Sequence, residues 1–236
     1  MELKEIVAPS CKSLFIREFE DMILSGRLKA GDKLPSERDI SVQMKIPRSV
    51  VSAGLAELEQ KGFVTINPRK GTIVADYMRS GNLQTLAAIT EFNGGYFDKR
   101  TFESIMELRM LIEPYCAYLA AKNRTDADIE HMEEALLKAE NASNLDEVLK
   151  YRDEFHSGMY CASNNTIFPL IYNAFKEVNH TFAVTVFYTL GMESKSFGIR
   201  ELLDAIRDRD CERARECKIN MDKIVMETLR SKYFSA

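Results

Sequence analysis

The sequence lacks several features that mark common classes of protein. No apolar run reaches the roughly 18 residues of a membrane-spanning helix, and the start, Met1 to Glu5, does not resemble a signal peptide. The five cysteines have neither the even number nor the spacing of a disulfide framework, which favours a reducing compartment. We therefore expect a cytoplasmic protein with no membrane partner. No pair has CxxC spacing, so we expect no zinc site and no cofactor.

Motifs of common enzymes are also missing. The sequence has no glycine-rich phosphate loop, no nucleophile elbow and no HExxH. Asp153 and His156, with one of the cysteines, are the nearest approach to an active site, and such a scattered trio is weak. We expect a protein that is not an enzyme, with a metal-dependent helical enzyme as the alternative.

Charge is divided unevenly along the chain. The net charge is −4, but residues 1–75 hold 12 Lys and Arg against 10 Asp and Glu, whereas the remainder holds 20 against 26. A phosphate backbone attracts positive charge, so any contact with nucleic acid is expected in the first part.

The most informative segment runs from Leu34 to Val74. Ser36 followed by Asp39 forms a capping box, which predicts that a helix starts there. A second helix begins near Pro47 and ends before Gly62, residues that favour a helix start and a helix end. Two β-rich runs, 63–66 and 72–74, then surround a basic tip.

This order of elements is that of a winged helix-turn-helix, which places one helix in the DNA major groove and a basic loop beside it. Val51, Leu55 and Leu58 recur at helical spacing and should face inward. The candidate DNA-binding residues are those left on the outer face, in the first turns and at the tip: Ser36, Arg38, Arg48, Ser49, Ser52, Arg69, Lys70 and Gly71.

The rest of the chain is predicted to be helical. Residues 76–82 read as a linker between a DNA-binding domain, residues 1–75, and a second domain, residues 83–236. Helical periodicity predicts helices at 83–93, 98–122, 126–141, 145–162, 166–190, 197–208 and 211–231, two of them with capping residues at Thr125 and Asn144. The fold class is therefore mostly α: a winged helix-turn-helix followed by an all-α bundle.

Arg109 is the physical candidate for binding an effector. It falls inside an apolar stripe that includes Phe102, Ile105, Ile112 and Cys116, on a helix that is apolar nearly all round and is therefore predicted to be central. A buried guanidinium needs an anionic partner. That partner is either a ligand carboxylate or phosphate, or an internal Glu or Asp.

The first third resembles the DNA-binding domain of the GntR family of bacterial transcription regulators. The resemblance is carried by Gly26 to Leu28, Gly31 to Arg38, Arg48, Leu55, Leu58, Gly62 and Gly71-Thr72. It implies that Arg38 and Arg48 contact DNA. The chain departs from the family pattern at Ser52, where arginine is usual, and at Gly54, where alanine is usual.

The helical part resembles the ligand-sensing domain of the FadR-type subgroup. The carrying residues are Glu107 to Arg109, Glu113, Phe155-His156, Asn165, Leu202 to Ile206, Asp210 and Ala214. The resemblance implies a homodimer on a palindromic operator, with a small anionic effector, a carboxylate or an acyl thioester, inside the bundle. Arg109, Arg152, His156 and Asn165 are the candidate effector-binding residues.

Many sensors of this subgroup hold a metal through one Asp and three His. The corresponding positions here are Arg152, His156, Ile199 and Met221, so we expect no metal. One interpretation of Arg152 is a fixed cation in the place of the metal, and His156 is either a core residue or a ligand contact. A third class of function is a protein–protein module that uses the winged domain as a scaffold.

Overall fold

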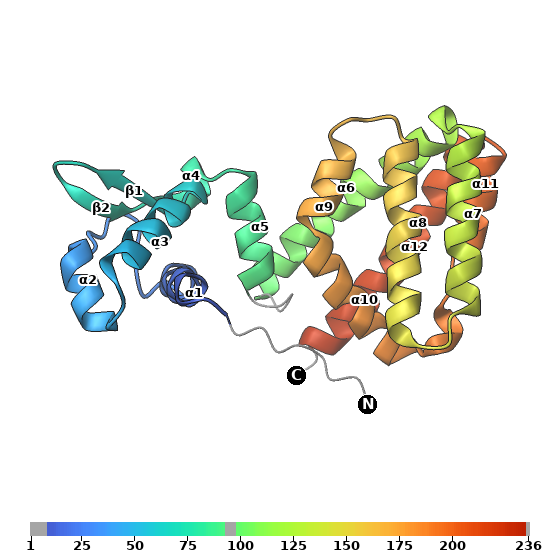
Figure 1. Ribbon diagram of the computed structural model, residues 1–236. Coiled ribbons are helices and arrows are strands. Elements are labelled where there is room, and N and C mark those ends of the chain that lie inside the picture. The colour runs from blue at the N-terminus through green and yellow to red at the C-terminus, as the bar shows by residue number, and fades with distance from the viewer. Residues whose placement is uncertain (1–8, 93–97, 235–236) are drawn as a thin grey trace. The chain divides into compact units, whose positions relative to one another are not determined.

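The computed structural model describes residues 9–92 and 98–234. The chain divides into two compact units, one ending at residue 93 and the other beginning at residue 94 (Figure 1). The first unit contains helices and one small sheet: α1 (Cys11–Leu24), α2 (Glu37–Met44), α3 (Arg48–Gln60), β1 (Val64–Asn67), β2 (Gly71–Val74), α4 (Tyr77–Ser80) and α5 (Leu83–Phe92). The predicted winged helix-turn-helix is confirmed.

Local chemistry explains where α2 and α3 begin and end. The Ser36 side chain accepts a hydrogen bond from the Asp39 backbone N–H at 3.2 Å, which caps α2 as the sequence predicts. Pro47 precedes the first residue of α3. Gly62 follows this helix with a φ of 76°, a conformation that a side chain would disfavour.

The two strands form an antiparallel hairpin, with Val64 opposite Val74 and Asn67 opposite Gly71. The segment before α2 adds one bridge to β2, between Lys33 and Ile73. Because one face of the hairpin is buried, this register holds the turn between β1 and β2 away from the core as a wing.

A helix that the sequence analysis did not single out, α1, completes the core of the first unit. Its Phe15, Phe19 and Ile23 are buried in the core of this unit, where α1 packs on α3 and α5. Gly54 of α3 lies so close to Phe15 that a Cβ atom there would be 2.3 Å from the ring. The departure from alanine at this position therefore has a packing reason.

The boundary between the units differs from the predicted linker at 76–82. That segment contains α4, and the predicted helix at 83–93 forms as α5 but packs on the first unit. The Thr85 hydroxyl donates to the Lys61 backbone carbonyl at 2.6 Å, and Ala88 belongs to the hydrophobic core of the first unit. Tyr77 meets Phe63 edge to face, with ring centroids 5.6 Å apart.

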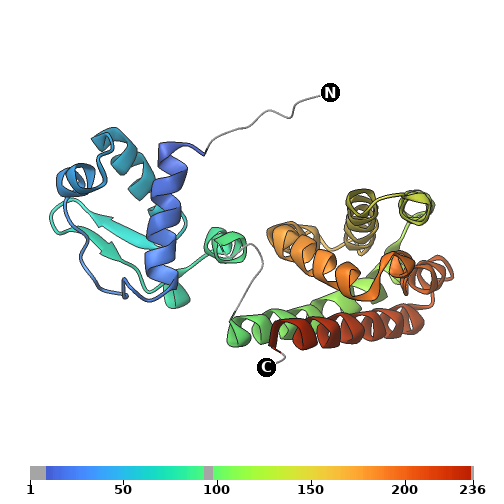
Figure 2. The same cartoon turned by 90° about the horizontal axis from the view of Figure 1, so that it is seen from below.

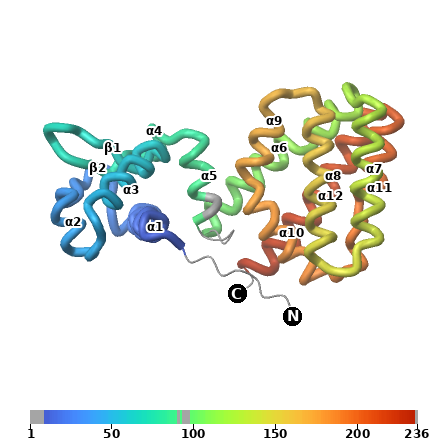
Figure 3. The backbone as a smooth tube through the Cα atoms, viewed as in Figure 1, coloured from blue at the N-terminus to red at the C-terminus, as the bar shows by residue number. Residues whose placement is uncertain are grey.

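Every regular element among the described residues of the second unit is a helix. Its elements are α6 (Lys99–Asn123), α7 (Asp126–Asn141), α8 (Leu145–Ala162), α9 (Phe168–Ala174), α10 (Lys176–Leu190), the short 3₁₀ helix η1 (Met192–Ser194), α11 (Ile199–Arg207) and α12 (Cys211–Phe234). Helices α6 and α12 run side by side (Figure 2), and α7 pairs with α8 (Figure 3). The predicted bundle is confirmed.

Two details of the predicted bundle were wrong. The single helix expected over 166–190 is two helices, α9 and α10, which break at Phe175. The sequence predicts α6 to be central because it is apolar nearly all round, but Leu111 and Tyr115 on this helix are 75% and 52% exposed. No helix among the described residues is long and apolar enough to cross a membrane.

Candidate nucleic-acid interface and ligand cavity

The first turns of α3 present a polar outer face. Arg48, Ser49 and Ser52 are exposed, whereas Val51 and Leu55 on the other side of the helix are buried. The fold therefore directs the three polar side chains to solvent while the apolar stripe fixes the helix.

Arg48 is positioned by a neighbour that the sequence analysis did not identify. Its Nε atom lies 3.2 Å from Oε2 of Glu37, at the start of α2, and its side chain is 72% exposed. Arg38 is also exposed, one residue further along α2. The Ser36 hydroxyl is occupied locally, since it donates to the Asp39 carboxylate at 2.7 Å.

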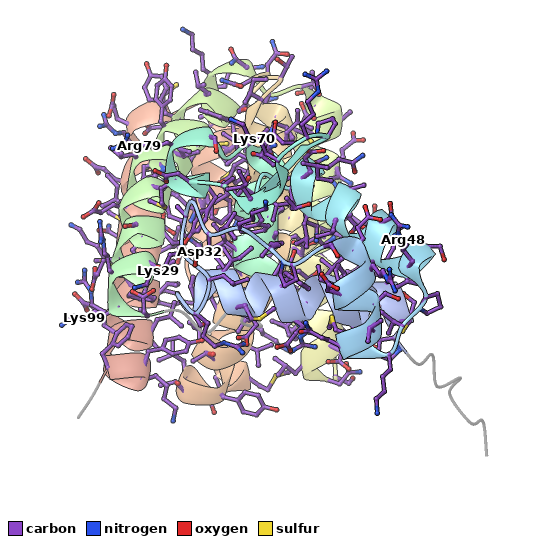
Figure 4. The ribbon with its side chains drawn as sticks, turned by 90° about the vertical axis from the view of Figure 1, so that its left-hand side faces the viewer. Lys29, Asp32, Arg48, Lys70, Arg79 and Lys99 are labelled. Carbon is purple, nitrogen blue, oxygen red and sulfur yellow. The ribbon has the colours of Figure 1, made fainter. Side chains whose placement is uncertain are left out.

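The wing carries the other predicted contacts. Arg69, Lys70 and Gly71 are exposed between or at the ends of the two strands. Figure 4 marks Arg48 at the start of α3 and Lys70 at the wing, on the side of the unit that faces the viewer. The structure thus brings the recognition turn and the wing to one side of the domain.

The second unit contains a cavity of about 420 Å³. This volume lies within the roughly 300–1,000 Å³ range of small-molecule sites. Three of the four candidate effector residues, Arg109, Arg152 and His156, line it, and Asn165 does not. The side-chain oxygen Oδ1 of Asn165 instead accepts from the backbone N–H groups of Ile167 and Phe168 at the start of α9.

Arg109 belongs to a buried ionic network. Its Nε lies 2.8 Å from Oε1 of Glu113, and its Nη1 donates to the side-chain oxygen of Asn179 at 2.9 Å. The other oxygen of Glu113 pairs with Lys218, which also pairs with Asp222. Two cations and two carboxylates are therefore packed together inside the bundle.

The network shifts the pKa values of its two acids, Glu113 and Asp222, in opposite directions. Burial would raise the pKa of Glu113, but Arg109 and Lys218 lower it to about 2. Burial and the charge of Glu113 raise the pKa of Asp222 to about 7. One oxygen of Asp222, Oδ2, is buried and accepts no hydrogen bond within the described structure. Asp222 is thus the member of the network whose hydrogen bonds are least complete.

Arg152 has a different environment. Its Nη1 donates to the backbone carbonyl of Lys195 at 2.9 Å, and its guanidinium lies over the ring of Phe187, 5.2 Å from the centroid. Burial lowers its pKa to about 10, so it still carries its charge at neutral pH.

The surroundings of His156 disfavour its protonated form. Burial lowers its pKa well below the ordinary value, and the charges of Lys218 and Arg152 lower it further. Asp153, one turn away, does not pair with it. The Asp153 carboxylate accepts from the Tyr172 hydroxyl at 2.7 Å and lies 3.2 Å from Nζ of Lys176.

The residues do not fit the metal site of related sensors. Ile199 and Met221 are buried in the apolar core, and Arg152 is a cation. Across residues 9–92 and 98–234, no three His, Cys, Asp or Glu side chains cluster as ligands. Of the four positions that correspond to the metal ligands, only His156 could bind a metal, whereas a tetrahedral zinc site needs three or four protein ligands.

Two family models match the two units. Residues 16–74 match the bacterial regulatory proteins of the gntR family, and residues 104–221 match the FCD domain. The HTH-type transcriptional repressor NanR of Citrobacter rodentium is 30% identical over 208 residues, which cover 82% of this chain and 75% of NanR. The HTH-type transcriptional regulator LutR of Bacillus subtilis is 30% identical over 153 residues, covering 64% of this chain and 68% of LutR.

Two solved structures have folds similar to that of this chain. Lar, described as controlling expression of the Listeria monocytogenes agr system, superposes with a TM-score of 0.64 at 14% identity over 94% of this chain and 98% of Lar. McbR/YncC of E. coli has a TM-score of 0.53 at 18% identity over 95% of this chain and all of that structure.

Together with the fold, these matches identify a DNA-binding transcription regulator whose helical domain is of the FCD ligand-sensing type. Its relatives are regulators and not enzymes, which excludes the interpretation as a metal-dependent enzyme. The chain belongs to the GntR family, in the group in which an FCD domain follows the winged helix.

Proposed function

We propose that the protein acts as a homodimer on a palindromic operator, in the bacterial cytoplasm where the DNA lies. Each α3 enters a major groove, so that Arg48, Ser49 and Ser52 meet base edges while Arg69 and Lys70 contact phosphates. The observation that carries this proposal is the shared orientation of the exposed recognition turn and the wing.

An apolar patch on the second unit supports dimerisation. Leu111 and Tyr115 are exposed on α6, and Leu170 of α9 is 57% exposed. Tyr115 stacks on Tyr118 and meets Phe168 edge to face, with ring centroids 6.1 and 6.4 Å apart. Such a patch on a protein surface marks an interface, because its burial would remove apolar area from water.

The effector of this proposal is a small anion bound in the cavity of the second unit. An anion that binds one arrangement of the dimer more tightly than another shifts the placement of the two winged domains. A coupling of about 1–3 kcal/mol between the sites is typical and corresponds to a change of roughly 5- to 150-fold in operator affinity.

Light scattering of purified protein and a variant pair test the dimer. We expect two copies per particle, dissociation in Leu111→Glu, and no change in Leu137→Glu, which alters an exposed leucine of α7 outside the patch. Operator fragments selected from random DNA should be palindromic and should bind Leu111→Glu more weakly than the wild type. A monomeric wild type, or a monomeric Leu137→Glu variant, would contradict the proposed interface.

A further inference from the structure

The charged side chains that line the cavity do not balance. Four cations and three carboxylates line it: Arg109, Lys150, Arg152 and Lys176 against Glu113, Asp146 and Asp153. The two histidines that line the cavity, His156 and His180, contribute no negative charge. The lining itself therefore has one more cation than acid, and Glu154, which lies outside the lining, is the partner of Lys150.

Three of the four cations have acid partners. Arg109 pairs with Glu113, and Lys176 pairs with Asp153. Nζ of Lys150 lies 4.0 Å from Oε1 of Glu154 at the surface. Asp146, the remaining acid, lies in the first turn of α8, where the helix dipole stabilises a negative charge.

Arg152 is the lining cation without an acid partner in the described structure. Its described hydrogen bonds all leave from Nη1, toward the backbone carbonyls of Lys195 and Ser194. A guanidinium has five N–H donors, and Nε and Nη2 make no hydrogen bond to the described residues. Two parallel donors of this kind match the two oxygens of a carboxylate.

The wall next to Arg152 is apolar. Phe187 lies under its guanidinium, and the same cavity is lined by Leu149, Phe182, Ala183, Val186 and Val225. These side chains come from α8, α10 and α12 and supply no hydrogen-bonding group to a ligand. A ligand held at Arg152 would extend along a surface that favours hydrocarbon.

On the basis of the effector role proposed above, we propose that the cavity binds a monoanionic carboxylic acid with an apolar body, and that Arg152 holds its carboxylate. Arg109 is then a positioning residue that keeps Glu113 and Asn179 in place behind the site. A single carboxylate gives Arg152 the acid partner that it lacks, whereas a tricarboxylate would leave negative charge buried without a partner.

Calorimetric titration of the full-length protein with four probes tests this assignment. Octanoate has both parts of the proposed ligand, acetate lacks the apolar body, 1-octanol lacks the charge, and citrate has excess charge. We expect octanoate to bind at least tenfold more tightly than each of the other three probes.

Substitutions identify the anchor. Arg152→Met should weaken octanoate binding at least tenfold and leave the weak binding of 1-octanol unchanged, because the apolar wall remains. Lys150→Met, the same substitution at another lining cation of α8, should change octanoate binding less than twofold. The melting temperature of each variant without ligand shows whether the fold is intact.

Equal octanoate affinity in Arg152→Met and the wild type would overturn the role of Arg152. Tighter binding of citrate or acetate than of octanoate would overturn the ligand class while leaving an anion sensor. Failure of all three anions to bind or to change operator affinity would instead count against the effector role itself and would overturn both proposals.

Discussion

The Nε atom of Arg109 lies 2.8 Å from Oε1 of Glu113, one helical turn further along α6. The sequence left open whether the anionic partner of this guanidinium is a ligand or an internal acid. The internal acid is present, and Glu113 is in turn shared with Lys218 from α12. Glu113 thus takes part both in an ion pair within α6 and in an ion pair between α6 and α12.

Arg109→Met should therefore destabilise the fold. The substitution removes the charge but keeps most of the apolar stem, and Glu113 loses one of its two cations in a buried place. Breaking such a pair costs about 3–5 kcal/mol, and the lower end applies because Lys218 remains. Urea unfolding measures this loss, with Arg100→Met at an exposed position of α6 as the control. Equal stability of the two variants would show that the pair contributes nothing.

Asp222 predicts a dependence of stability on pH. Its pKa is raised to about 7 in the folded protein, mainly by burial and then by Glu113. The folded state therefore holds a proton that the unfolded state has already released, and this stabilisation is lost as the pH rises through about 7. Between pH 6 and pH 8 the free energy of unfolding of the wild type should fall by about 1 kcal/mol more than that of Asp222→Asn. Parallel stability curves for the two proteins would contradict the raised pKa.

Gly54→Ala should bring no gain in stability. Alanine is better than glycine in a helix by about 1 kcal/mol, but its Cβ atom would lie 2.3 Å from the Phe15 ring. Overpacking of this kind costs about 1–3 kcal/mol, so we expect Gly54→Ala to be neutral or destabilising. A double-mutant cycle with Phe15→Leu should show positive coupling between the two positions. A stabilising Gly54→Ala would mean that the core relaxes without cost.

Arg48→Ala should weaken binding to a selected operator by about 1–3 kcal/mol and relax discrimination at one base position. The residue is the first of α3, is 72% exposed, and is oriented by Glu37. Fluorescence anisotropy on matched and randomised DNA measures the effect. Arg79→Ala changes an 88% exposed cation of α4 and serves as the control. Equal losses on both DNAs would assign Arg48 to phosphate contact only.

Capping residues made several helices predictable to the residue. Thr125 and Asn144 cap α7 and α8, and both helices have the predicted bounds. Side-chain caps act within three residues of the helix start, so they can be read locally. The break between α9 and α10 has no such signal, because Phe175 is neither glycine nor proline and continues the apolar pattern.

The ionic network could not be predicted for the opposite reason. Lys218 and Asp222 have the i, i+4 spacing of an ordinary surface pair, which normally lies in water. Their burial follows from the packing of α12 on α6, which brings Lys218 to Glu113 across 105 residues of chain. The same distance effect explains why Arg152 and His156 were assigned to an effector site by the family resemblance and not by the pattern of their own helix.

Operator affinity measured with and without a bound ligand tests the central claim most directly. Anisotropy titrations with a selected operator, in the presence and absence of saturating octanoate, should differ by at least about fivefold for the wild type. Arg152→Met should bind the same operator equally well and show no difference on adding octanoate. A wild type whose operator affinity is the same with and without octanoate bound in its cavity would contradict the account.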